Sequence, residues 1–134
     1  MSNTAVVTGS GSGVGQAVAI GLAKQGWKVA LVGRRAESLQ ETIDQAGAEL
    51  AGQFLACPCD IGNQEDVAAM GQKVLEAFGD VEVLVNSAGT NTPKRNFDVL
   101  SNEDYQRIVD VNLSGSFHCA QAFLPSMREK GSGT

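Results

Sequence analysis

Glycine and serine dominate one short segment near the start of the chain, Thr8-Gly9-Ser10-Gly11-Ser12-Gly13-Val14-Gly15. Glycines at this spacing permit a tight turn and a close approach of the backbone to a phosphate group. A helix that begins in such a turn adds free N–H groups and a dipole that attract an anion. No Lys-Ser or Lys-Thr pair follows the glycines, so the segment is not a P-loop. A glycine-rich turn without any ligand is the alternative.

Residues that commonly bind metals or form disulfides are few. His118 is the only histidine, which excludes a site built from several histidines. Cys57, Cys59 and Cys119 are an odd set, with neither a disulfide nor a zinc-binding pattern. We therefore expect no metal site, and free thiols of this kind fit a reducing, cytoplasmic location.

The composition is that of a folded, acidic domain. The chain has 134 residues, 43% of them hydrophobic, which is enough to bury a core. Its 15 acidic residues exceed its 10 basic residues and give a net charge of −5. An acidic balance without a basic block argues against nucleic-acid binding. We also expect no membrane association, because the sequence has neither a secretory leader nor an apolar run of the ~18 residues that cross a bilayer.

The elements that would position the glycine segment alternate between strand and helix. Short β-branched runs predict strands at 5–7, 28–32, 54–57 and 81–85. Longer runs predict helices at 14–25, 36–46 and 63–78, the last of them beginning at the N-cap Asn63. This alternation predicts an α/β fold, a Rossmann-like doubly wound parallel sheet of about four strands in the order 3-2-1-4.

A long helix is predicted after a polar loop. Ser101 and Asp104 have the spacing of an N-cap and its N3 partner, and the helix should continue to about Lys130 with an irregularity at Pro125. Its apolar residues spread around more of the circumference than one contact with a sheet would use. They are Ile108, Val109, Val111, Leu113, Phe117, Cys119, Ala120, Phe123 and Leu124.

Four segments together resemble the classical short-chain dehydrogenases/reductases. Thr8-Gly9-x-x-x-Gly13-x-Gly15 resembles the cofactor loop of that family. Asp60-Ile61, Asn86-Ser87-Ala88-Gly89 and Val111-Asn112 follow in the family's order, so the match spans essentially the whole chain. The resemblance implies that residues 1–134 are an NAD(P)-binding Rossmann domain, the N-terminal part of an oxidoreductase. Such an enzyme transfers hydride between a nicotinamide and a small carbonyl or alcohol substrate.

The resemblance also implies roles for individual residues. Gly9 and Gly13 would face the pyrophosphate of the cofactor, Gly15 would allow close helix packing, and the Asp60-Ile61 pair would flank the adenine. Asn112 would take the catalytic-type position that supports a water relay. The implied cofactor-binding residues are Gly9, Ser12, Gly13, Val14, Gly15, Arg34, Arg35, Asp60, Ile61, Asn86, Ala88 and Gly89.

Arg34 and Arg35, at the end of the second predicted strand, bear on which nicotinamide cofactor is used. An NAD-selective site has an acidic residue about 20 residues past the loop that binds the ribose 2′-hydroxyl. Residues 32–35 contain no acid, and a guanidinium can bind a 2′-phosphate through paired N–H donors. We therefore favour NADP(H), with NAD(H) as the second candidate. A solvated arginine pair without a ligand is the alternative.

The rest of the family's catalytic machinery has no match in the chain. The family uses a Tyr-x-x-x-Lys pair and a Ser after the fifth strand, whereas the only tyrosine, Tyr105, is followed four residues later by Val109. No lysine lies between Lys94 and Lys130. We expect the chain to be inactive by itself, as a piece of a larger fold or one that another polypeptide completes.

The last predicted strand leads to the same expectation. With Thr134 as the final residue, 81–85 would be an apolar edge strand without a partner, which proteins normally cover. We expect a homo-oligomer, or a complementing chain, to pack on the long helix. A non-catalytic nucleotide-binding module and an assembly protein are the alternative functions.

Overall fold

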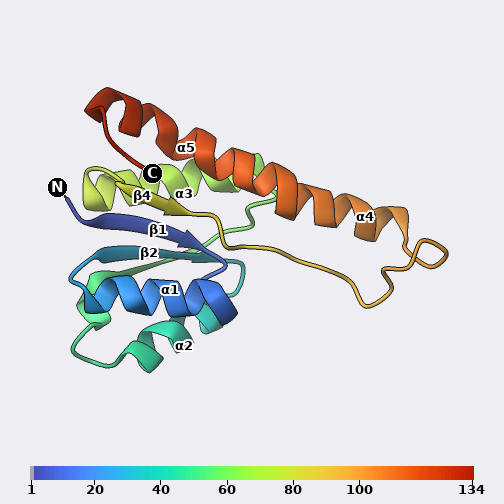
Figure 1. The fold of residues 1–134 in the computed structure, drawn as a ribbon, viewed down its shortest axis with the longest axis horizontal. Coiled ribbons are helices and arrows are strands. Elements are labelled where there is room, and N and C mark those ends of the chain that lie inside the picture. The colour runs from blue at the N-terminus through green and yellow to red at the C-terminus, as the bar shows by residue number, and fades with distance from the viewer. Residues whose placement is uncertain (1) are drawn as a thin grey trace.

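Four parallel strands form a sheet in the order β3-β2-β1-β4 (Figure 1). The computed structural model describes residues 2–134. Val6 of β1 is opposite Ala30 of β2 and Leu84 of β4, so β1 is paired on both sides. The predicted strand order is confirmed, and the predicted bounds differ from the observed ones by at most two residues. The strands are β1 Thr4–Thr8, β2 Lys28–Gly33, β3 Phe54–Pro58 and β4 Val83–Val85.

Helices cover both faces of the sheet, as expected for a Rossmann-like, doubly wound α/β fold. α1 and α2 lie on one face, and α3 and α5 lie side by side on the other (Figure 1). No helix among residues 2–134 is both long and apolar enough to cross a bilayer. The helices are α1 Gly13–Lys24, α2 Ala36–Ala46, α3 Gln64–Phe78, α4 Asn102–Val109 and α5 Gly115–Lys130, with a short 3₁₀ turn at Ala51–Gln53.

Each face of the sheet has its own apolar core, and β1 contributes to both. Val6 belongs to the core that contains Phe123 of α5, whereas Val7 belongs to the core that contains Leu39 of α2. All five residues of β1 are buried. Burial on both faces explains why the strand is a continuous apolar run rather than an alternating one.

Two predicted N-caps are confirmed. The Asn63 side chain accepts a hydrogen bond from the N–H of Asp66 at the start of α3 (3.1 Å). Ser101 accepts one from the N–H of Asp104 at the start of α4, also at 3.1 Å. Each cap satisfies a backbone donor that the first turn of a helix leaves free.

The long helix is interrupted at a different place from the one predicted. After α4, residues Asp110–Ser114 form a π-helical segment, and α5 then continues to Lys130. At Pro125, where the sequence predicted an irregularity, α5 continues although proline has no N–H for the helical hydrogen bond. The interruption instead contains Asn112, whose side chain bonds to a neighbouring loop. Single π-helical turns of this kind are frequent at functional sites.

The edge of β4 is partly paired, contrary to the expectation of a strand without a partner. The N–H of Thr134 donates to the carbonyl of Glu82 at 3.0 Å, and the N–H of Leu84 donates to the carbonyl of Thr134 at 2.8 Å. This is the hydrogen-bond pattern of a parallel ladder. Thr134 is therefore paired in parallel with β4.

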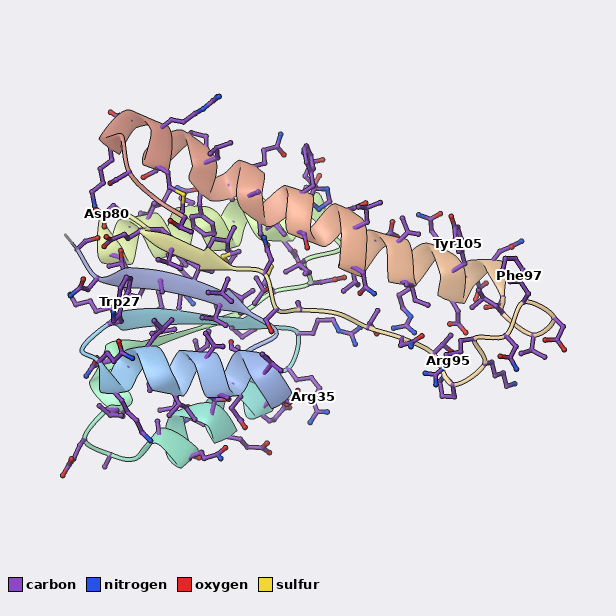
Figure 2. The ribbon with its side chains drawn as sticks, viewed as in Figure 1. Trp27, Arg35, Asp80, Arg95, Phe97 and Tyr105 are labelled. Carbon is purple, nitrogen blue, oxygen red and sulfur yellow. The ribbon has the colours of Figure 1, made fainter. Side chains whose placement is uncertain are left out.

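A polar cluster at the amino end of the sheet holds the end of α5. The Asp80 carboxylate accepts hydrogen bonds from Lys130 Nζ and from Thr4 Oγ1, the latter at 3.1 Å. These bonds, the one from Lys130 above all, lower the pKa of Asp80 below its ordinary value of 3.8. Asp80 lies at the end of the sheet opposite to Arg35 (Figure 2). The cluster therefore joins secondary-structure elements far from the carboxyl ends of the strands.

We expect Lys130→Met to lower the free energy of unfolding at pH 7 by about 1 kcal/mol or less, the usual range for a partly exposed ion pair. Because the folded-state pKa of Asp80 is lowered, the pair stabilises the protein above the unfolded-state pKa. That contribution is lost as the pH falls through the folded-state pKa. Urea unfolding of wild type and variant from pH 7 to pH 2 measures it, and a difference that does not shrink in acid would contradict the assignment.

Candidate functional site

The segment between β1 and α1 is packed too closely for side chains at two of its glycines. Gly9 has φ +64°, and a Cβ built there would lie 2.7 Å from the Cα of Ala88. A Cβ at Gly15 would lie 2.3 Å from the carbonyl oxygen of Gly9. Real Cβ atoms do not come so close to backbone atoms. Glycine at these positions therefore lets the glycine loop touch both the loop after β4 and the first turn of α1.

Thr8 joins the same two loops through its hydroxyl. Its Oγ1 accepts hydrogen bonds from the N–H groups of Ser87 and Ala88, both at 3.1 Å, and donates to the Val85 carbonyl at 3.4 Å. Thr8 is fully buried. It was part of the glycine motif in the sequence, but without a role of its own, because its partners lie almost 80 residues away.

Three adjoining hollows form one groove along the carboxyl ends of the strands. A hollow of about 210 Å³ lies between the glycine loop and the start of α2, and one of about 90 Å³ lies between the ends of β2 and β3 and the loop after β4. A third of about 470 Å³ lies between the loop after β3 and α4. Arg34 lines all three. In doubly wound sheets, ligands bind at this edge.

The groove brings together residues that the sequence had placed in four separate segments. The predicted residues that line it are Gly9, Ser12, Arg34, Arg35, Asp60, Ile61 and Gly89. Gly13, Val14 and Gly15 form the start of α1, where Val14 is exposed. Ala88 lies against Gly9, and Asn86 is exposed in the loop after β4.

The glycine-loop end of the groove favours an anion. α1 has no acidic residue in its first turn, and the Ser12 side chain makes no capping hydrogen bond within the described structure. The free N–H groups and the helix dipole are thus available. Arg34 and Arg35 are exposed nearby. Neither takes part in the ion pairs found among residues 2–134.

Asp60 and Ile61 follow β3 and divide their roles. The Asp60 carboxylate accepts a hydrogen bond from the N–H of Gly62 at 3.0 Å, which shapes the turn into α3. Ile61 is buried and packs so closely on α5 that a Cβ at Gly115 would lie 2.7 Å from its side chain. Asp60 therefore presents a polar group to the groove, while Ile61 anchors the loop in the core.

Asn112 lies in the π-helical segment, and its carboxamide both accepts a hydrogen bond from the loop after β4 and donates one to it. Its Oδ1 accepts from the N–H of Thr90 at 2.7 Å, and its Nδ2 donates to the carbonyl of Thr90 at 3.0 Å. Arg107 Nη1 donates to Thr90 Oγ1 at 2.9 Å. The carboxamide is thus held beside Gly89. The sequence has no local signal for Thr90 or Arg107 as its partners.

Other residues with possible chemistry do not join the groove. Tyr105 is exposed on α4, and Phe97 is exposed on the loop between β4 and α4 (residues 86–101), called the projecting loop because it extends beyond the sheet (Figure 2). Burial raises the pKa of Cys59 to about 12 and that of Cys119 to about 11, so both thiols stay protonated. His118 Nδ1 is 3.2 Å from the carbonyl of Ile61 and donates to it. No group of three metal-binding side chains is found among residues 2–134.

The sheet and its groove define the class of protein. A glycine loop that leads into a helix at the carboxyl edge of a doubly wound sheet is the arrangement of Rossmann-type domains that bind nucleotides. The family model of short chain dehydrogenases matches residues 3–134. The chain therefore belongs to the short-chain dehydrogenase family.

Individual relatives agree with this assignment. An uncharacterised oxidoreductase of Staphylococcus aureus (strain USA300) is 37% identical over 129 residues, 96% of this chain and 54% of the relative. A metagenomic short-chain oxidoreductase solved with NADP has a TM-score of 0.91 at 30% identity, covering 98% of this chain and 59% of that one. The 3-ketoacyl-(acyl-carrier-protein) reductase of Brucella melitensis solved with NADH has a TM-score of 0.87 at 34% identity, covering 96% and 51%.

The chain thus spans about half the length of the curated relatives it matches. What it shares with them is the sheet, the glycine loop and the helices up to α5. The features of the groove described above all lie within this shared part.

We expect Gly15→Ala to destabilise the protein by about 1–3 kcal/mol or more, because the added methyl group would collide with the Gly9 carbonyl. Gly21→Ala in the same helix is the matched control, since a Cβ there has open space. It should stabilise the protein by about 0.5–1 kcal/mol through helix propensity. Thermal unfolding measures both, and equal melting temperatures would contradict the packing.

Proposed function

We propose that this chain is the cofactor-binding part of an NADP(H)-dependent oxidoreductase that transfers hydride between the nicotinamide and a carbonyl or alcohol substrate. The observation that carries the proposal is the position of Arg34. It lines every hollow of the groove, at the end of β2, where an NAD-selective site would have a carboxylate. Relatives solved with NADP and with NADH support a nicotinamide cofactor in general.

The groove fits such a dinucleotide in both shape and charge. Gly13 has φ +57° and open space where a Cβ would lie, so the backbone there can approach a diphosphate at the start of α1. The hollow lined by Arg34, Arg35 and Ser38 suits a 2′-phosphate, because guanidinium groups bind phosphate through paired donors. The smaller hollow beside Asp60 suits the adenine, and the loop that contains Asn86, Ala88 and Gly89 would border a ribose.

When bound, NADP(H) supplies or accepts the hydride, and the residues of this chain bind and orient it. Asn112, held on the loop after β4, is the proposed support for a water relay. Proton transfer needs a further group, and Tyr105, exposed in the middle of α4, does not line the groove. We propose that the tyrosine and lysine of the family pattern are supplied from outside residues 1–134. The chain by itself should then bind nucleotide without turnover.

We expect Arg34→Asp to weaken NADPH binding by roughly 10- to 100-fold, because a charge-assisted contact is lost and a repulsive charge is gained. NADH binding should change little or improve, since an acid at this position can bind the 2′-hydroxyl. Fluorescence titration of the full-length protein with both nucleotides measures the ratio of the dissociation constants. Arg95→Asp, on the projecting loop, is the control with the same charge change (Figure 2).

If Arg34→Asp leaves the ratio of the dissociation constants for NADPH and NADH unchanged, the proposed preference for NADP(H) is wrong. Absence of binding to either nucleotide by the wild-type protein would remove the proposed function altogether. A protein that binds NADPH but does not turn over carbonyl substrates at full length would favour the non-catalytic nucleotide-binding module.

We further propose that another polypeptide packs on the outer face of α5 and of the π-helical segment before it. The partner that we propose is a second copy of the protein. Leu113, Phe117 and Leu124 lie on this face with 70%, 62% and 47% of their surfaces exposed. Their spacing places them along one side of the helix. Large apolar side chains that share one exposed face mark interaction surfaces in many proteins.

We expect Phe117→Asp to reduce the molar mass of the full-length protein in solution, because a charge on an apolar interface opposes association. Size-exclusion chromatography with light scattering measures the mass. Val99→Asp, an exposed apolar position on the projecting loop, is the control. Equal masses for wild type and Phe117→Asp would contradict the proposed interface.

A further inference from the structure

Thr42 is a buried polar residue of α2 that faces the glycine loop rather than the groove. Its side chain has no exposed surface. Its Oγ1 lies 2.7 Å from the carbonyl oxygen of Ser10 and donates to it. The Ser38 carbonyl, one turn earlier in α2, is a longer alternative acceptor at 3.3 Å. A hydroxyl has a single proton, so the shorter bond to the loop is the stronger one.

Gln16, in the first turns of α1, donates hydrogen bonds both to Thr42 and to the glycine loop. Its Nε2 donates to Thr42 Oγ1 at 2.9 Å and to the carbonyl of Gly11 at 3.4 Å. Ser10 is also tied to the end of β2, where its N–H and its hydroxyl both point at the carbonyl of Val32, at 3.4 and 3.5 Å. Side chains from two helices therefore hold two successive carbonyl groups of the loop.

Holding these carbonyls also orients the N–H groups next to them. In a planar trans peptide the carbonyl of one residue and the N–H of the next point in opposite directions. The N–H of Gly11 therefore points away from Thr42, and the N–H of Ser12 points away from Gln16. Gly11 and Ser12 both line the hollow beside Arg34. Backbone N–H groups with a fixed orientation in such a loop form an anion-binding concavity.

We infer that Thr42 and Gln16 are positioning residues for nucleotide binding: they touch no ligand but set the orientation of the glycine-loop peptides that bind its phosphates. The inference rests on the proposed function. The two side chains lie outside the groove but would still contribute to the binding affinity. They order the loop before the nucleotide binds, so that the loop loses less conformational entropy on binding.

The test uses the full-length protein and the substitution Thr42→Val, which keeps the shape of the side chain but removes the hydroxyl. We expect the dissociation constants for NADPH and for NADH to rise about three- to tenfold, the range for one hydrogen bond. Thr42→Ser keeps the hydroxyl and should bind within about twofold of wild type. Gln16→Met, at a less buried position, should weaken binding in the same direction and decides the question if Thr42→Val does not fold.

Thr4→Val is the matched control. Thr4 is also a buried threonine with a side-chain hydrogen bond, but its partner Asp80 lies at the amino end of the sheet. It should lower the melting temperature and leave both dissociation constants unchanged. If Thr42→Val and Gln16→Met behave like Thr4→Val, with lower stability and unchanged affinity, the residues are structural only and the inference is wrong. Failure of the wild-type protein to bind either nucleotide would instead overturn the proposed function, and this inference with it.

Discussion

The shape of the protein at the carboxyl ends of its strands depends on a close contact between backbone segments that leaves no space for side chains. Gly9 lies against Ala88, and Gly15 lies against the carbonyl of Gly9. The neighbouring strands β1 and β4 thereby end at loops that touch, and the buried hydroxyl of Thr8 bonds across the junction. A side chain at Gly9 would push the two loops apart, and one at Gly15 would push the first turn of α1 away from the glycine loop. The shape of the groove at this edge follows directly from that contact.

The two ends of the sheet show different uses of polar groups. At the amino end, Asp80 and its partners Lys130 and Thr4 bond to one another and join α5 to the sheet. At the carboxyl end, Arg34 and the N–H groups at the start of α1 are left available. Parallel strands place every strand-to-helix loop at the second end. The fold orients Arg34 and these N–H groups but leaves them without hydrogen-bond or ion-pair partners among the described residues. They are therefore available to bind a charged ligand.

Side-chain hydrogen bonds join the loop after β4 to the interrupted helix beside it. Asn112 bonds to both backbone groups of Thr90, Arg107 bonds to its hydroxyl, and Thr92 donates to the carboxylate of Asp104 at 3.1 Å. These bonds hold the loop along α4, beyond the end of the sheet (Figure 1). A π-helical turn at Asn112 is compatible with this attachment, whereas the sequence predicted one long helix whose irregularity was at Pro125.

Residue patterns were enough to predict the alternation of strands and helices, the parallel sheet in the order 3-2-1-4, the caps at Asn63 and Ser101, and the resemblance to the family. All of these depend on local periodicity, on turn residues or on short motifs, which can be recognised in a stretch of a few residues. The three-dimensional arrangement was needed to identify the partners of Thr8, Thr42 and Asn112, the π-helical turn, and the pairing of Thr134 with β4. Those features depend on single hydrogen bonds between segments that are distant in the chain, and a lone threonine or asparagine has no pattern that names its partner.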